Sequence, residues 1–167
     1  NFVEIQTEWL RIGEILGRTD QAKILREKVS REAERIRRLT EKLTATRAFF
    51  QIGANPLFTI PVHSFMQDYL RMAGGANIAA DAGIGIYSIE QVLKRNPEVI
   101  FIALMGVDGD TEKAVWMKFT VLKASQTGRI HLIDPYTSCS PTPLTFVETL
   151  KKLAAWLHPE IAGKIYS

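Results

Sequence analysis

The sequence predicts an α/β fold, a three-layer lobe built on a parallel sheet with a long helix on its N-terminal side. From residue 46 onward, short apolar runs typical of buried strands alternate with helical segments, and this alternation is the pattern of a parallel sheet covered by helices. One helical pattern of about 25 residues precedes them, which is long for a domain of this size. With 167 residues, of which 46% are hydrophobic, the chain can bury one ordinary core.

Two helices are predicted before residue 46. The first ends near Gly17, and its apolar residues recur at helical spacing: Ile5, Trp9, Ile12 and Leu16. The second, 19–44, has Thr19 or Asp20 as its N-cap and is about 38 Å long. Its narrow apolar stripe consists of Leu25, Val29, Ala33, Ile36, Leu39 and Leu43. Such a stripe usually packs on a domain surface, and the length of this helix also suits a strut between two lobes.

The rest of the chain is predicted to alternate strands with helices. Buried strands are expected at 47–52, 99–104 and 130–133. Helices are expected at 64–74 with Ser64 as the cap, at 88–95, at 111–121 and at 144–158. The helix at 88–95 has the clearest signals, because Ser88 and Gln91 form a capping box and Asn96-Pro97 ends it.

The loops that follow the strands are the expected ligand-facing edge. They span 53–61, 105–110 and 134–143, and they are long and rich in Gly, Pro, Ser, Thr and aromatic residues. In parallel sheets, ligands bind outside the carboxyl ends of the strands. Phe58 and Tyr136 each follow a strand within such a loop, where an aromatic side chain lines a pocket as readily as it packs.

No catalytic constellation is recognisable in the sequence. There is no G-x-S-x-G elbow, and "GIGIYS" lacks the third glycine of a dinucleotide loop and follows a loop rather than a strand. Cys139 lies between two serines without a histidine predicted nearby, so a bystander is the better interpretation. Catalysis usually leaves a cluster of titratable groups in a cleft, and its absence here favours a binding protein over an enzyme.

Metal, cofactor and nucleic-acid sites are not indicated either. His63, His131 and His158 are far apart in the sequence, and the acidic residues of 108–112 lack calcium-loop spacing. The net charge of +3 is too small to argue for a nucleic-acid partner. No apolar run approaches the ~20 residues that span a bilayer. We therefore expect no catalytic residues, no cofactor and no nucleic-acid partner.

The stretch from 47 to 102 resembles one family of transport proteins. It contains, in order, "RAFFQIGANPLFT", "SFMQDYLRMAGGANI" and "SIEQVLKRNPEVIFI". In this order and spacing the segments are similar to the C-terminal lobe of the periplasmic substrate-binding proteins of ABC importers for iron–siderophores, haem and cobalamin. The later segments "LKASQTGRIHLIDP" and "FVETLKKLAAWLHPE" continue the resemblance, which covers roughly residues 8–160.

The resemblance implies a two-lobed, extracytoplasmic protein that holds its ligand between the lobes. Residues 1–45 would then be a helical hairpin that includes the long inter-lobe helix, and 46–167 would be the C-terminal α/β lobe. The N-terminal lobe, with any signal peptide or lipid anchor, is expected in a part of the protein that precedes this chain. The partners implied are a metal-chelate small molecule and the membrane-spanning permease of an ABC importer.

The resemblance also suggests ligand-binding residues. Related proteins often carry an arginine in the loop that matches "SCSPTP", where Thr142 stands near that position. The resemblance therefore does not predict recognition of an anionic ligand group by this lobe. Phe58 and Tyr136 suggest aromatic stacking instead, and Ser138 suggests a hydroxyl hydrogen bond. The sequence offers no His, Cys or Asp cluster for direct coordination of the metal, so we expect no metal ligands here.

Glu90 has two interpretations. In the first turn of the helix at 88–95 it can simply stabilise the helix dipole, which is worth about 0.3–1 kcal/mol. In the resembled family, a glutamate at this place in the lobe meets arginines on the permease, and "SIEQVL" puts Glu90 at that position. A carboxylate on a rigid helix start can accept a bidentate arginine fork. We therefore expect Glu90 to be a permease-docking residue.

Two alternatives to the importer remain open on sequence alone. One is a flavodoxin-like or nitrogenase-component-like α/β enzyme domain whose active site is completed by another chain. The other is a pure interaction domain. The importer hypothesis predicts binding without turnover, and an upstream lobe in the full gene.

Overall fold

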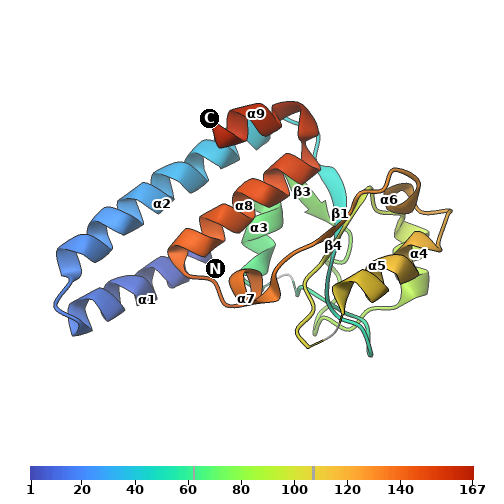
Figure 1. Ribbon diagram of the computed structural model, residues 1–167, viewed down its shortest axis with the longest axis horizontal. Coiled ribbons are helices and arrows are strands. Elements are labelled where there is room, and N and C mark those ends of the chain that lie inside the picture. Colours follow the sequence, from blue (N-terminus) through green and yellow to red (C-terminus); the bar gives the residue numbers. More distant parts are fainter. Residues whose placement is uncertain (62, 107) are drawn as a thin grey trace.

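A mostly parallel sheet lies between two layers of helices (Figure 1). The structure, a computed structural model, describes residues 1–61, 63–106 and 108–167. The parallel strands are β3 (Gly75–Asn77), β1 (Thr46–Gly53), β4 (Val99–Ile102) and β5 (Ile130–Leu132). The short strand β2 (Phe58–Thr59) pairs antiparallel with the end of β1. The three-layer α/β prediction is confirmed.

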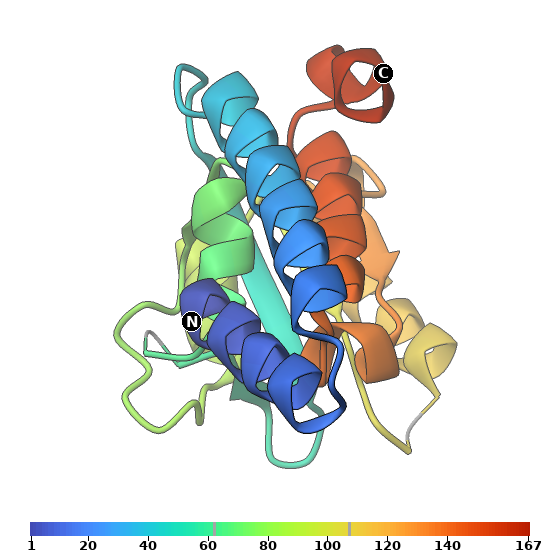
Figure 2. The ribbon, with the colours of Figure 1, turned by 90° about the vertical axis from the view of Figure 1, so that its left-hand side faces the viewer.

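One layer of helices covers the face of the sheet on which Ala48, Phe50 and Phe101 lie. Its members are α1 (Phe2–Ile15), α2 (Thr19–Thr40), α3 (Met66–Met72) and α8 (Pro143–Leu157). Figure 2 shows α2 running between α3 and α8. The predicted apolar stripe of α2 packs into the core on this face of the sheet, where Val29, Ala33 and Ile36 are buried.

The opposite face of the sheet carries a second core. Side chains alternate across a strand, so Phe49 and Ile100 point to this face while their neighbours point to the other. The covering helices are α4 (Ile89–Arg95), α5 (Gly109–Met117) and α6 (Lys123–Gln126). Trp116 of α5 is 1% exposed here. Burial on both faces explains why β4 (VIFI) is entirely apolar and why residues 48–51 of β1 are all buried.

The C-terminal part of the chain contains three short helical elements around α8. They are α7 (Pro135–Cys139), the 3-10 turn Pro159–Ile161 and α9 (Ala162–Tyr166). Arg35 of α2 holds α9 in place, because its guanidinium donates to the carbonyls of Lys164 (2.7 Å) and Ile165 (2.6 Å). Within the described residues, none of the helices combines the length and the apolarity that crossing a bilayer requires.

Several predicted boundaries are wrong. Thr19 and Asp20 do not cap α2, because the cap position is Arg18, which makes no side-chain capping bond. The helix ends at Thr40 rather than 44, where the Thr40 hydroxyl donates to the Met72 carbonyl (2.9 Å). The segment 134–143 is not simply a loop, since Asp134 accepts the Tyr136 N–H (2.9 Å) and starts α7. Strands β2 and β3 were not predicted.

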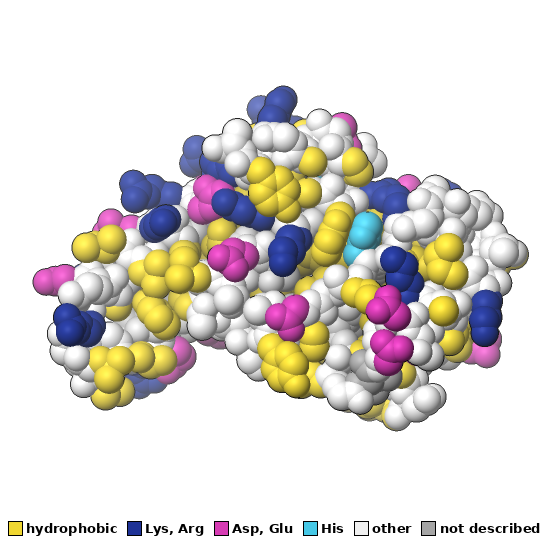
Figure 3. Space-filling model, in the orientation of Figure 1, with side chains coloured by type: hydrophobic (Ala, Val, Ile, Leu, Met, Phe, Trp, Pro, Cys, Tyr) yellow, Lys and Arg dark blue, Asp and Glu magenta, His cyan; other side chains and the backbone are white. Residues whose placement is uncertain are grey.

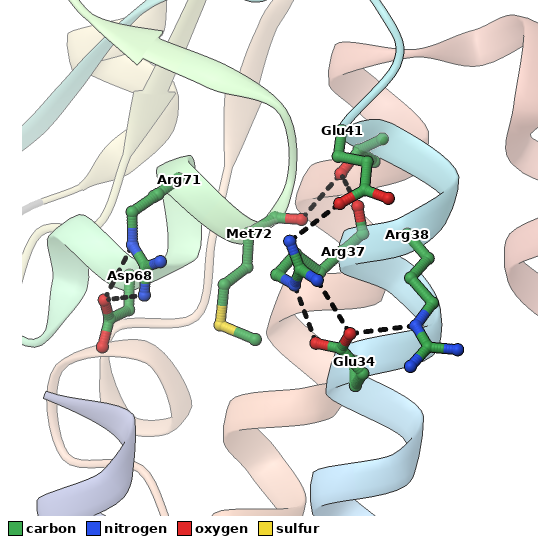
Figure 4. A network of polar contacts seen from close by, with 8 residues as sticks. Glu34, Arg37, Arg38, Glu41, Asp68, Arg71 and Met72 are labelled. Carbon is green, nitrogen blue, oxygen red and sulfur yellow. Dashed lines mark hydrogen bonds and ion pairs between the residues drawn. The ribbon is translucent and has the colours of Figure 1, made fainter.

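Several ion pairs lie on the outer face of α2 (Figure 4). Glu34 accepts hydrogen bonds from Arg37 (2.7 Å) and from Arg38 (2.9 Å), and Arg37 also reaches Glu41 (2.8 Å). These side chains are all at least two-fifths exposed, apart from Glu41 at 39%. Exposed pairs of this kind contribute about 0–1 kcal/mol each, so the attachment of α2 depends on its buried stripe.

Candidate functional site

An apolar groove separates α1 from the loops that precede α3 and α8. Its volume is about 620 Å³, and most of its lining surface is apolar. The side chains that define it are Ile5, Trp9, His63, Phe65, Pro141 and Thr142. A concave surface of this size with a few polar groups is the usual form of a small-molecule site.

Local structure fixes two walls of the groove. Thr142 caps α8, with its Oγ1 accepting the Thr145 N–H (3.2 Å) while the Thr145 hydroxyl accepts the Thr142 N–H (2.9 Å). Phe65 stands at the N-cap of α3, and its ring meets Tyr69 edge-on with centroids 6.3 Å apart. Ser64 supports this turn by accepting the Met66 N–H (3.2 Å). The wall residues are therefore held by helix caps rather than by loop packing alone.

Trp9 lines the groove with its aromatic ring. Its indole Nε1–H is buried and has no hydrogen-bond partner among the described residues. A buried donor left unpaired costs about 1–3 kcal/mol. Because this N–H has no accessible surface, a ligand in the groove meets the ring of Trp9 and not its N–H. The other polar groups of the lining include the exposed imidazole of His63 and the carboxylates of Glu4 and Glu8. No Lys or Arg is among these lining residues, which disfavours a strongly anionic ligand group.

The predicted ligand residues do not converge on one place. Thr142 lines the groove. Phe58 is half-buried on β2, where its ring lies against the backbone of Gly53. Tyr136 starts α7 and is 74% exposed, free to meet a ligand from outside. Ser138 is fully buried and its hydroxyl donates to the Asp134 carbonyl (2.9 Å), so a ligand could reach it only if α7 opened.

Sequence reasoning missed Trp9 and His63 as members of a site. Trp9 was assigned to the apolar residues of its helix, and His63 was considered only as a possible metal ligand. The structure does expose His63 and half-buries Trp9, and it places both on the groove. The positions lie far apart in the sequence, so no local pattern could have joined them.

Glu90 lies in the first turn of α4, as predicted. The Ser88–Gln91 capping box is present, and Asn96 ends the helix in the left-handed conformation. Hydrogen bonds from the backbone N–H of Glu90 and from the Ser88 hydroxyl lower the pKa of the exposed Glu90 carboxyl, which is therefore charged at neutral pH. Glu90 forms no ion pair with any other described residue.

The other candidate nucleophilic and metal-binding side chains give little evidence of a functional site. Cys139 is half-buried, and burial raises the pKa of its thiol, so the nucleophilic thiolate is disfavoured. Asp108 caps α5 by accepting the N–H groups of Asp110 and Thr111. In the part of the chain that the structure describes, no group of three or more His, Cys, Asp or Glu side chains is arranged to hold a metal ion.

Known proteins resemble this chain in sequence and in fold. The family model described as periplasmic binding protein matches residues 2–137. The vitamin B12-binding protein of Yersinia pestis (strain Pestoides F) is 34% identical over 73 residues, which are 42% of this chain and 26% of that protein. Other vitamin B12-binding proteins from Yersinia match to the same degree.

Solved structures with the same fold are longer than this chain. A periplasmic haem-binding protein from Pseudomonas aeruginosa has a TM-score of 0.81 at 21% identity, over 95% of this chain and 61% of that one. The periplasmic vitamin B12-binding protein of Vibrio cholerae has a TM-score of 0.79 at 20% identity, over 98% and 63%. A possible iron-binding protein from Staphylococcus epidermidis ATCC 12228 has a TM-score of 0.80 at 23% identity, over 95% and 63%.

At these identities the likeness to solved structures bears on the fold alone, and this chain spans less than two thirds of each of those proteins. The family match is the stronger finding, because it extends over well more than half of the residues. The chain belongs to the periplasmic binding protein family.

Proposed function

We propose that this chain is the C-terminal lobe, with its inter-lobe helix, of an extracytoplasmic substrate-binding protein that captures a metal chelate and delivers it to an ABC importer. The observation that carries the proposal is the apolar groove beside α1. It is present in a chain whose fold matches part of the fold of solved periplasmic binding proteins. The protein acts by binding rather than by turnover. Any lipid anchor would belong to the part of the protein that precedes this chain.

Exposed apolar residues support a second lobe packed against the helical hairpin. Hydrophobic side chains gather over the α1–α2 turn, at the left-hand end of Figure 3. The exposed fractions are 48% for Ile12, 83% for Ile15, 67% for Leu16 and 68% for Ile24. An exposed apolar surface of this kind marks a contact with another domain or protein. We therefore keep 1–45 as the hairpin with the inter-lobe helix and 46–167 as the C-terminal lobe.

The groove favours an uncharged or cationic ligand with flat apolar surface. Trp9 and Phe65 offer ring faces and edges, while the Thr142 hydroxyl offers a polar contact at the wall. The relatives are named for vitamin B12, haem and iron, which supports an iron–siderophore, haem or cobalamin-type chelate whose organic shell is recognised here. The metal would reach the protein already chelated.

Ligand titration of the full-length protein tests the proposal. Cobalamin, haemin and a ferric hydroxamate are added separately while tryptophan fluorescence is followed, and one of them is expected to bind with sub-micromolar affinity. Residues 1–167 alone should bind it weakly, since they supply half of the cleft. Tight binding by residues 1–167 alone would contradict the two-lobe arrangement, and failure of the full-length protein to bind any chelate would contradict the proposed function.

Variants locate the binding surface within the lobe. Trp9→Phe reduces the ring surface that lines the groove, and Thr142→Val removes the hydroxyl, so each should weaken binding of the chelate by about 1 kcal/mol. Phe58→Ala and Tyr136→Ala test the two loop aromatics in the same way. Trp156→Phe is the matched control, because Trp156 stacks on His131 away from the groove lining and its loss should leave affinity unchanged.

A further inference from the structure

A second pocket, lined mostly by basic side chains, lies between α2, α8 and α9. Its volume is about 460 Å³, within the range of about 300–1,000 Å³ that small-molecule sites usually have. Its lining has four cationic side chains and one acidic side chain: Lys28, Arg31, Arg35, Lys151 and Glu32. None of these residues lines the apolar groove. This second pocket is called the basic pocket below.

Helical spacing brings the basic residues of α2 to one side of that helix. Lys28, Arg31 and Arg35 are three and four residues apart, so their side chains are neighbours on one face. Lys151 reaches the same place from α8. The helix α9 lies beside the C-terminal half of α2 (Figure 1), because Arg35 donates hydrogen bonds to two carbonyl groups of α9. Three helices that are held together by these contacts therefore form the walls.

Glu32, the acidic residue of this lining, already has two cationic partners. Its Oε1 lies 2.7 Å from the Nη2 of Arg35 and 2.7 Å from the Nζ of Lys151, and its Oε2 accepts a hydrogen bond from the Nε of Arg35 (2.9 Å). The hydrogen bonds from Arg35 are the main cause that lowers the pKa of Glu32 to about 2, so this carboxylate is charged at neutral pH. The three side chains are partly buried. They form a fixed base of the pocket with one positive charge in excess.

Lys28 and Arg31 lie at the rim of the basic pocket with their charges unpaired. Both residues are exposed, and neither forms an ion pair with any described residue. Farther along α2, Arg37 and Arg38 are by contrast paired with Glu34. The guanidinium of Arg31 presents a fork of donors, and the ammonium of Lys28 adds a point charge from the neighbouring position. These two groups are therefore available to an anion.

We propose that the basic pocket binds a phosphate monoester, with Arg31 and Lys28 donating to the phosphate oxygens above the base that contains Lys151. A phosphate monoester carries about two negative charges and three terminal oxygens, so it accepts an arginine fork and an ammonium at the same time. A carboxylate has two oxygens and one charge, and it would leave part of the excess positive charge unbalanced. The hydroxyl groups of Tyr166 and Ser167, which also line the pocket, are further donors. The volume leaves room for the organic group of the ester.

Binding at this place would also stabilise the fold. The like charges of Lys28, Arg31 and Arg35 repel one another on one face of α2, and a bound anion removes that repulsion. The anion would also join α2 to α8 and α9, the elements that line the pocket. A ligand that binds only the folded state raises the free energy of unfolding. The site is separate from the chelate groove, so it does not depend on the proposed function.

Titrations of the full-length protein at low ionic strength test the inference. Glycerol 3-phosphate is the soluble probe in calorimetry, with acetate as the carboxylate comparison. Vesicles of phosphatidic acid present the same phosphate monoester on a lipid, and vesicles of phosphatidylglycerol present an anionic diester instead. The double variant Lys28→Gln with Arg31→Gln should weaken binding of the phosphate monoester at least about tenfold, because it removes both free donors. Lys23→Gln with Arg26→Gln is the matched control, since it removes two exposed charges of the same helix that do not line the pocket.

The outcomes identify the source of the phosphate or overturn the site. Binding of glycerol 3-phosphate that only the pocket variant loses supports a soluble phosphate monoester. Binding of phosphatidic acid vesicles alone, again lost only in the pocket variant, supports a lipid headgroup. The inference is overturned if neither probe binds, if both double variants lose binding equally, or if acetate or phosphatidylglycerol binds as well as the monoester. Chelate affinity should be the same in both double variants, so the proposed function is tested separately.

Discussion

The imidazole of His131 stacks on the indole of Trp156, with ring centroids 4.5 Å apart and ring planes 7° apart. His131 lies on β5 and Trp156 on α8, so the stack joins the edge of the sheet to the last long helix. Burial, with the nearby charges of Lys113 and Arg129, lowers the pKa of His131 to about 4. The folded protein therefore keeps this imidazole neutral well below the ordinary histidine pKa of about 6.5.

Stability is expected to fall as the pH drops from about 6.5 to about 4. In this window the unfolded chain binds a proton at His131 that the folded chain does not, so acid favours unfolding. His131 is only half-buried, and solvent screening reduces the effect to about 1–2 kcal/mol. His131→Phe keeps an aromatic ring on Trp156 but cannot be protonated. Urea unfolding at pH 7.5, 5.5 and 4.5 should show a shallower loss for this variant, and an identical loss would rule out His131 as the cause.

Gln51 is expected to stabilise the fold because its side-chain amide forms hydrogen bonds with two other side chains. It is fully buried in β1, where its Oε1 accepts the Trp116 indole N–H (2.6 Å) and its Nε2 donates to Glu112 (2.8 Å). Gln51→Leu should lower the free energy of unfolding by about 1–3 kcal/mol, because it leaves a buried indole donor unpaired. In the Trp116→Phe background, where that donor is gone, the same change should cost clearly less. Equal costs in the two backgrounds would show that the indole bond contributes nothing.

Phe2 is expected to anchor α1. Its ring stacks on Phe146 at 4.2 Å, Phe146 stacks in turn on Tyr69 at 4.2 Å, and the Phe2 N–H donates to Asp68 (2.8 Å). Phe2→Ala should lower the free energy of unfolding by about 3–5 kcal/mol, the usual cost of emptying a buried aromatic position. Val3→Ala is the matched control, since Val3 is 67% exposed and its loss should cost at most about 0.5 kcal/mol. Similar urea midpoints for the two variants would contradict the anchoring role.

Two neighbouring glycines should respond differently to alanine. Gly85→Ala forces a side chain into a left-handed backbone and against the Thr59 carbonyl oxygen, and should cost about 1–3 kcal/mol. A Cβ on Gly83 would meet nothing within 4 Å, and Gly83 does not have a positive φ, so Gly83→Ala should be neutral or stabilise by up to about 1 kcal/mol. Urea unfolding of the two variants checks the difference, and equal stability would show that the segment relaxes freely.

The sequence predicted best what local chemistry decides. Ser88 and Gln91 form the expected capping box and Asn96 ends the helix, because these interactions involve residues a few positions apart. Strands β2 and β3 were missed because two or three residues carry no period of their own and become strands only by pairing with β1. The start of α2 was misplaced because Arg18 makes no side-chain cap that a pattern could reveal.

The candidate site was harder to predict for the same reason. Thr142 was selected from a resemblance, while Trp9 and His63 reach the groove only through the packing of α1 beside distant loops. Ser138 was selected for its hydroxyl. In the structure that hydroxyl donates to the Asp134 carbonyl within α7, a helix that was not predicted. A hydrogen-bonding side chain in a loop is available to a ligand only if the local backbone does not use it.

The packing of α2 against α8 joins segments near the two ends of the chain, 19–40 and 143–157. During synthesis, α2 can pack on α1 and α3 first, and its contact with α8 forms only after residues 143–157 have emerged. Contacts of such long sequence separation also slow folding, because the intervening chain must be ordered first. The α2–α8 contact will therefore form late. Until then, the side of the α2 stripe that faces α8 stays uncovered, so a nascent chain exposes apolar surface within residues 19–40.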